Sequence, residues 1–145
     1  MPHTQTALER FFELYENNAN GGDIAALSAQ FADGFLAAGP QGAKAVRASD
    51  FAPALLKRKQ LFESLGCKSA ALLSLQPTAL DDRYTLARTQ WRMNFEPPQG
   101  SPQEVLADST FLVDTSGDAF KILVYLAHQD IAAILKVRGI APSPA

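Results

Sequence analysis

The sequence has few of the residues that build disulfides and metal centres. Among its 145 residues it has one cysteine, Cys67, and two histidines, of which only His128 lies beyond the N-terminal segment. One thiol excludes an internal disulfide and any metal site that needs several cysteines, and one histidine supplies too few ligands for zinc. We therefore expect no metal and no cofactor. The low cysteine content also favours a cytoplasmic location.

The sequence also lacks long apolar runs and an excess of basic charge. No run approaches the roughly 20 apolar residues that span a bilayer, and the N-terminus has no basic segment followed by an apolar core. Lys and Arg number 13 against 15 Asp and Glu, and the one basic run is residues 57–59. Nucleic-acid binding requires clustered Lys and Arg. We expect no nucleic-acid or membrane partner.

The remaining composition is typical of a folded domain, with 47% hydrophobic and 19% charged residues. A chain of this length usually folds as one domain. We expect a single domain over residues 1–145, with residues 139–145 as a frayed tail.

The first half of the chain predicts three helices. Residues 6–17 carry apolar side chains at helical spacing, and Asp23 is a good N-cap for a second, short helix. A third helix is expected to begin at Ser49 or Asp50 and to end just before Gly66, with residues 57–59 turned to water. Its predicted buried side consists of Phe51, Leu55, Phe62 and Leu65. Before it, residues 35–38 predict a short strand that stops at the Gly-Pro-Gln-Gly loop, residues 39–42.

The second half predicts a sheet, because the apolar period changes to two after Gly66. Four strands with short connections are expected, over residues 68–75, 83–95, 104–114 and 119–128. Both alternating series of the last strand are largely apolar, which indicates a central strand buried on each face. Helices followed by a meander define an α+β fold. Strands of this length must twist and coil, so the concave face of the sheet is expected to wrap the helices.

Six short segments, read in order along nearly the whole chain, carry a family resemblance. They are Phe11-Phe-Glu-Leu-Tyr15, Asp23-Ile-Ala-Ala-Leu27, Phe31-Ala-Asp33, Gly39-Pro-Gln-Gly42, Lys121-Ile122 and His128-Gln-Asp130. Their order resembles the nuclear transport factor 2-like superfamily, especially its SnoaL-like and ketosteroid-isomerase-like members. The resemblance implies a cone-shaped α+β fold with three N-terminal helices against a strongly curved antiparallel sheet. It also implies a deep pocket between them and a homodimer.

The resemblance also allows the isomerase residues to be tested by position. The general base of that branch precedes the Pro-x-Gly segment, where this chain has Gly39, which cannot accept a proton. Steroid-isomerase chemistry is therefore not expected. The family's oxyanion acid corresponds most nearly to Asp108 or Thr110. If Asp108 faces the pocket, desolvation raises its pKa and makes it a neutral donor; the alternative is a carboxylate on the outer face of the sheet.

His128 and Asp130 form the other catalytic candidate. An imidazole can act as acid or base near neutral pH, and Asp130, two residues on, could orient it. The alternative is that His128 closes the strand with a hydrogen bond while Asp130 caps a final helical turn over residues 131–136.

Aromatic side chains indicate where a ligand would bind. On the second long strand the face that carries Trp91 is expected to point inward. Six side chains are predicted around an apolar pocket: Phe12, Tyr15, Phe35, Trp91, Phe111 and Tyr125. The alternative is that they fill the cone as a solid core.

Two functions follow. The first is a SnoaL-like pocket protein that binds a small apolar molecule and, if it is an enzyme, performs acid–base chemistry of an isomerase, cyclase or lyase type. The second is a non-catalytic dimeric interaction module that uses the convex face of the sheet.

Overall fold

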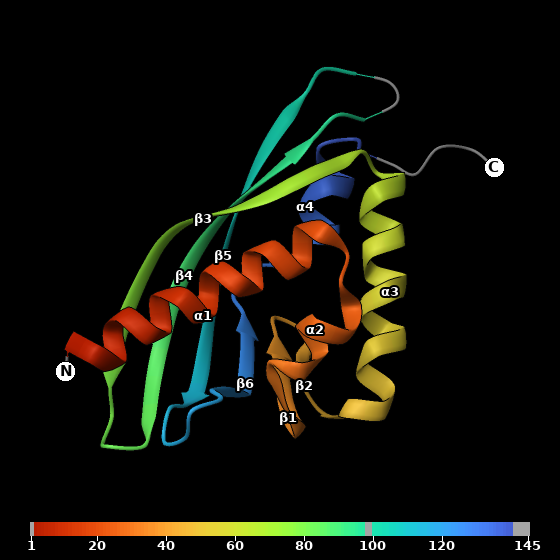
Figure 1. Ribbon diagram of the computed structural model, residues 1–145. Helices are drawn as coiled ribbons and strands as arrows, with labels where there is room; N and C mark the ends of the chain where they lie inside the picture. Colours follow the sequence, from red (N-terminus) through yellow and green to blue (C-terminus); the bar gives the residue numbers. More distant parts are fainter. Residues whose placement is uncertain (1, 98–99, 141–145) are drawn as a thin grey trace.

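The computed structural model describes residues 2–97 and 100–140, and of the predicted tail over residues 139–145 only Gly139 and Ile140 lie within that range. The helices are α1 (Pro2–Gly21), α2 (Ile24–Ala29), α3 (Ala48–Ser64) and α4 (Ile131–Val137). The strands are β1 (Phe31–Gly39), β2 (Gly42–Arg47), β3 (Cys67–Ala79), β4 (Tyr84–Phe95), β5 (Gln103–Asp114) and β6 (Lys121–Ala127) (Figure 1).

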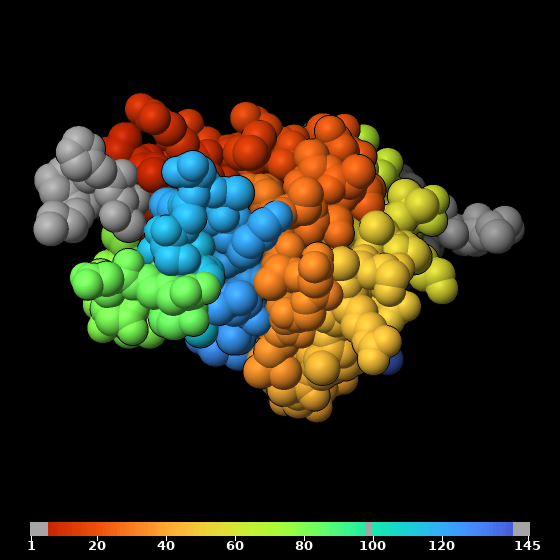
Figure 2. All heavy atoms as spheres, turned by 60° about the horizontal axis from the view of Figure 1, so that its bottom comes forward, coloured from red at the N-terminus to blue at the C-terminus, as the bar shows by residue number. Residues whose placement is uncertain are grey.

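The strands form one curved sheet in the order β2-β1-β6-β5-β4-β3. All neighbours are antiparallel except β1 and β6, which come from opposite parts of the chain and lie parallel and side by side (Figure 2). Helix α1 crosses the long strands, and α3 stands beside β1 and β2 (Figure 1). The predicted α+β architecture is confirmed.

The predicted end signals of the short helices are confirmed. The Asp23 carboxylate accepts a hydrogen bond from the Ala26 N–H at 3.1 Å, and the Asp130 carboxylate accepts one from the Ala133 N–H at 3.0 Å. These bonds satisfy backbone donors that a helix start leaves free.

Strand β2 was not predicted. It pairs only with β1, at the edge of the sheet, and nearly all of its residues are exposed. An edge strand that buries neither face needs no apolar alternation, so its sequence carries none. Strand β3 is also longer than expected and continues through Pro77, which the opposite edge of the sheet tolerates because one side of the strand has no ladder.

Strand β6 has the predicted central position, but its alternation is broken. Leu112 pairs with Val124 and Val113 pairs with Ile122, which leaves Leu123 as an extra residue. Such a bulge shifts the phase of the strand. Ile122 therefore joins the inner face with Tyr125, whereas the simple alternation grouped it with Val124.

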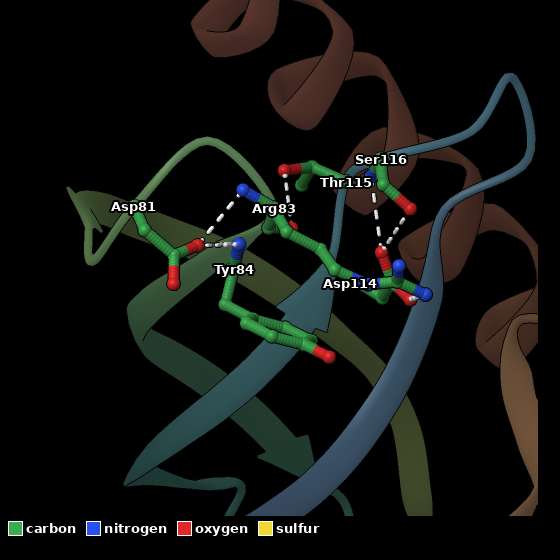
Figure 3. A network of polar contacts seen from close by, with 6 residues as sticks. All are labelled: Asp81, Arg83, Tyr84, Asp114, Thr115 and Ser116. Carbon is green, nitrogen blue, oxygen red and sulfur yellow. Dashed lines mark hydrogen bonds and ion pairs between the residues drawn. The ribbon is translucent and has the colours of Figure 1, made fainter.

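Polar contacts connect the two turns at one end of the sheet (Figure 3). Asp81 accepts hydrogen bonds from the N–H groups of Arg83 and Tyr84, both at 2.8 Å. Arg83 forms an ion pair with Asp114 at 3.0 Å, which connects the β3–β4 turn to the end of β5. The pKa of Asp114 is lowered, first by hydrogen bonds from Ser116 and then by Arg83. These exposed contacts set the register of the turns rather than build the core.

The interior contains two apolar clusters. The first joins α1 to the sheet, and its buried members are Leu8, Phe12, Phe31, Phe35, Ala87, Phe111, Val113 and Ile122. The second lies around α4, and its buried members are Leu65, Met93, Phe95, Val105, Ile131, Leu135 and Ile140. The helices are thus anchored at two places along the sheet.

Candidate functional site

A cavity of about 180 Å³ lies between the sheet and helices α1, α2 and α3. We call it the aromatic cavity, because its lining includes Tyr15, Phe62, Trp91, Phe111 and Tyr125. Phe111 belongs to the first apolar cluster and Met93, also in the lining, to the second. A cavity of roughly 150 Å³ with apolar walls is large enough for benzene. The aromatic cavity therefore has the size of a small ring compound.

Strand alternation positions the floor of the aromatic cavity. Every second residue of β4 from Thr85 to Phe95 is buried, so the predicted inward face of Trp91 is confirmed. The Trp91 indole N–H donates to the Thr89 hydroxyl at 2.8 Å, and that hydroxyl donates to the Ser109 carbonyl at 2.9 Å. The indole is therefore held in one orientation.

Arg58 borders the cavity from α3 while keeping the exposure predicted for residues 57–59, so its exposure agrees with the prediction and its place at the cavity was not predicted. It lines the aromatic cavity, and its guanidinium carbon lies 5.1 Å from the centroid of the Phe62 ring. Arg58 has a large accessible surface, but part of that surface faces the cavities it lines rather than bulk solvent. A signal was present in the sequence: Arg58 follows Leu55 by three residues and precedes Phe62 by four, which places all three on one helix face.

Arg58 and Tyr125 form the polar centre of the cavity. Burial raises the pKa of Tyr125, but the charge of Arg58 and hydrogen bonds with Ser109 and Arg58 outweigh that effect and leave the pKa lowered. Tyr125 in turn raises the pKa of Arg58. Tyr15 lies beside Trp91 with ring centroids 5.6 Å apart, and its pKa is raised, first by burial and then by Tyr125. Arg58 is thus a firm cation, and Tyr125 is a more acidic phenol than Tyr15.

A second cavity, of about 320 Å³, adjoins the first. We call it the hairpin cavity, because the β1–β2 turn over Gly39–Gly42 and the start of α4 border it. Arg58, Phe62, Ala107, Ser109 and Tyr125 line both cavities. The Arg58–Tyr125 pair therefore stands where the two cavities meet.

Gly39, at the position of the isomerase base, borders the hairpin cavity. A Cβ built there would meet only the Ala127 carbonyl oxygen, at 3.8 Å. The place of the family carboxylate is therefore open.

The six predicted ligand-binding residues divide into two groups. Tyr15, Trp91, Phe111 and Tyr125 line the aromatic cavity. Phe12 and Phe35 lie in the first apolar cluster, where Phe35 packs on Phe31 with ring centroids 4.7 Å apart. Each of the two alternatives, pocket and solid core, thus describes part of the aromatic set.

The predicted catalytic residues lie mainly on the other side of the sheet. The Asp108 carboxylate accepts hydrogen bonds from Gln129 at 2.8 Å and Gln90 at 3.2 Å. His128 is exposed, and its Nε2 lies 2.7 Å from the Thr110 hydroxyl oxygen. Asp108, Thr110 and His128 line a groove of about 340 Å³ on the convex face, which we call the convex groove.

Asp130 is not paired with His128. Its carboxylate caps α4 and accepts a hydrogen bond from the Gln41 side-chain amide at 2.7 Å. The arrangement matches the alternative in which His128 ends the strand and Asp130 begins a helix. A catalytic role for His128, Asp108 or Asp130 stays a prediction. Among the side chains described, those of residues 6–97 and 100–140, no three His, Cys, Asp or Glu converge as a metal site would require.

Of the comparisons with known proteins, only the one with solved structures gives matches, and it shows the fold. No family model and no curated protein matches the sequence. Among solved structures, the chain is similar to an NTF-2-like protein of unknown function from Shewanella oneidensis MR-1, with a TM-score of 0.63, 16% identity, and coverage of 89% of this chain and 100% of that one. It is also similar to Aln2 from a Streptomyces species, with a TM-score of 0.74, 10% identity, and coverage of 94% and 97%.

A third similar structure is a subunit of a larger assembly. It is the β subunit of benzoate 1,2-dioxygenase from Burkholderia mallei, with a TM-score of 0.68, 12% identity, and coverage of 88% of this chain and 91% of that one. Together with the curved sheet and its helices, these matches show that the chain has the nuclear transport factor 2-like fold. No helix among the described residues is long and apolar enough to cross a membrane.

The raised pKa of Tyr15 predicts a loss of stability in alkali. A tyrosine whose pKa in the folded state lies above its ordinary value of 10.0 stabilises the fold fully below that pH. Above about pH 10 the unfolded chain ionises first, so the free energy of unfolding falls by up to about 1.4 kcal/mol per pH unit. Urea unfolding between pH 8 and 11 should show a steeper fall above pH 10 in the wild type than in Tyr15→Phe, because both proteins share the contributions of Tyr125 and Cys67. Equal slopes would mean that Tyr15 ionises freely in the folded protein.

Proposed function

We propose that the protein is a SnoaL-like pocket protein that binds a small, largely apolar ring compound in the aromatic cavity. The observation that carries this proposal is the lining of that cavity, in which four of the six predicted aromatic rings surround a space of ring size, with the cationic side chains of Arg58, Lys59 and Lys68 also in the lining. Small-molecule sites have this composition: apolar and aromatic walls with a few converging polar groups. The proposal includes a cytoplasmic location, which the single free thiol of Cys67 favours.

Chemistry in this site, if the protein is an enzyme, would be acid–base chemistry. Tyr125 is the ionisable group best prepared for it, because Arg58 lowers the pKa of its phenol. Asp108 and Asp130 border the hairpin cavity and remain candidates from that side. Gly39 offers no base, which argues against the isomerase reaction.

Trp91 provides the test of ligand binding, because it is the only tryptophan and lines the cavity. Toluene and cyclohexanol are expected to change its fluorescence in a saturable way. Ala107→Leu should abolish the change, because Ala107 lies opposite Trp91 on β5 and the larger side chain would fill the cavity. Leu106→Ala is the control, since the neighbouring Leu106 is 47% exposed and does not line the cavity. No saturable change with either compound would contradict the proposal.

The second candidate function is a homodimeric interaction module. One observation favours it: Leu36, Val124, Leu112 and Leu86 pair in register across four strands and form an apolar row that the helices do not cover. A row of this kind suits a symmetric contact with a second copy. Sedimentation equilibrium should give a dimer, and Leu36→Lys should weaken it. A monomer at all concentrations would count against this function.

A further inference from the structure

Arg58 is a cation without an anionic partner among the described residues. The ion pairs there join Lys59 to Glu63 and Arg83 to Asp114. Glu63 also lines the aromatic cavity, but Lys59 holds its carboxylate at 3.4 Å. The immediate partners of the Arg58 guanidinium are the neutral ring of Phe62 and the phenol of Tyr125. Because Arg58 is exposed, its charge is solvated rather than buried, and an anion that replaces this water can pair with it.

The donors around this cation converge on one place. The Arg58 guanidinium and the Tyr125 hydroxyl lie at the junction of the two cavities, and Ser109 lines both cavities beside them. A guanidinium presents two parallel N–H groups that fit the two oxygens of a carboxylate. A phenol adds a third donor from the sheet side. The junction therefore has the donors of a carboxylate site.

The lining of the aromatic cavity indicates the chemistry of the remaining, apolar part of the ligand. The aromatic cavity has room for about one ring next to Trp91, and it is also lined by the rings of Tyr15 on α1 and Phe111 on β5, whose centroids are 5.4 Å apart. The Arg58–Tyr125 junction adjoins this ring site, whose lining also has polar side chains at Asn20, Lys68 and Ser69 and the Lys59–Glu63 ion pair. A ligand that satisfies both parts has an apolar ring and one acidic group.

We propose that the protein binds ring carboxylic acids, with the ring in the aromatic cavity and the carboxylate on Arg58 and Tyr125. This inference rests on the proposed ligand-binding function and specifies its substrate class. It assigns Arg58 as the residue that selects acids over neutral ring compounds, because its charge has no anionic partner among the described residues and, unlike Lys59 and Lys68 of the same lining, it also borders the hairpin cavity beside Tyr125.

Two isosteric probes test the inference. Cyclohexanecarboxylate and the neutral cyclohexanecarboxamide are titrated at pH 7.5 with Trp91 fluorescence as the signal. The carboxylate is expected to bind at least about tenfold more tightly to the wild type, as for a hydrogen-bonded charge pair. Arg58→Gln should remove that preference and change the carboxamide affinity less than about threefold. Lys57→Gln is the matched control, because it removes the same charge from a position of the same helix that lines neither cavity.

A second signal comes from Tyr125. An anion on Arg58 offsets the charge that favours the phenolate, so the carboxylate should raise the pKa of Tyr125 in an ultraviolet absorbance titration, whereas the carboxamide should leave it unchanged. The absorbance change that disappears in Tyr125→Phe is the one that belongs to Tyr125.

The outcomes separate the two proposals. Saturable binding of both probes with equal affinity, or a preference that survives in Arg58→Gln, overturns the inference and leaves the ligand-binding function intact. Binding of neither probe overturns the inference, and it overturns the ligand-binding function as well only if toluene and cyclohexanol also fail to bind.

Discussion

Replacing Gly66 with alanine is expected to destabilise the protein by about 4 kcal/mol. Gly66 has a φ of +90°, a backbone conformation that costs other residues about 1–2 kcal/mol. A Cβ there would also clash with the Glu96 carbonyl group, whose carbon would lie 2.5 Å away, and with the Pro97 Cα at 2.9 Å. Relieving such an overlap costs about 1–3 kcal/mol. The two costs add because the conformation and the contact are separate.

The backbone around Gly66 has little freedom to move away. The Glu96 N–H donates to the Gly66 carbonyl at 2.7 Å, which ties the end of α3 to the end of β4. Gly139→Ala is the matched control, since Gly139 has a φ of +77° but an added Cβ would meet nothing within 4 Å. Urea unfolding followed by Trp91 fluorescence should give a loss of about 1–2 kcal/mol for this control. Equal losses in the two variants would mean that the contact with Glu96 costs nothing.

Replacing Phe12 with alanine is the second large change, with an expected loss of about 3–5 kcal/mol. Phe12 is fully buried, and its ring centroid lies 5.0 Å from that of Phe111 and 5.3 Å from that of Phe11. Because it lies in the first apolar cluster between α1 and the sheet, its removal leaves a void that the sheet cannot close.

Leu14→Ala on the same helix is the control for Phe12. Leu14 is 51% exposed, so the free energy of unfolding should change by no more than about 0.5 kcal/mol. A loss below about 1 kcal/mol for Phe12→Ala would show that the interior is loosely packed beyond the aromatic cavity.

Much of the fold could be predicted from the sequence because the signals are local. Alternation on β4 identified the inward face of Trp91, and carboxylates at Asp23 and Asp130 marked two helix starts. These features depend on neighbours within four residues along the chain. The order of the elements was sufficient for the α+β class.

The features that were missed depend on partners distant in sequence. Strand β2 forms because the backbone of β1 pairs with it by hydrogen bonds, and its exposed residues carry no apolar pattern of their own. The bulge at Leu123, which moves Ile122 to the inner face, appears only in the pairing of β6 with β5.

The aromatic residues of the candidate site could be predicted from the sequence, but the cavity itself and Arg58 were not. The aromatic residues were found because they are apolar and periodic, but whether they enclose a space depends on packing, which left Phe12 in the core and Trp91 at a cavity. Arg58 was missed because it stands between two lysines, and a basic run on a helix is usually its solvated side. Its spacing from Leu55 and Phe62, rather than its charge, indicates the inward direction.

A crystal structure of the protein with cyclohexanecarboxylate is the most direct test of the carboxylate site. The ring is expected beside Trp91, with the carboxylate oxygens within hydrogen-bond distance of the Arg58 guanidinium and the Tyr125 hydroxyl. A closed interior at this position, or a carboxylate bound instead in the convex groove near Arg88 and His128, would contradict it.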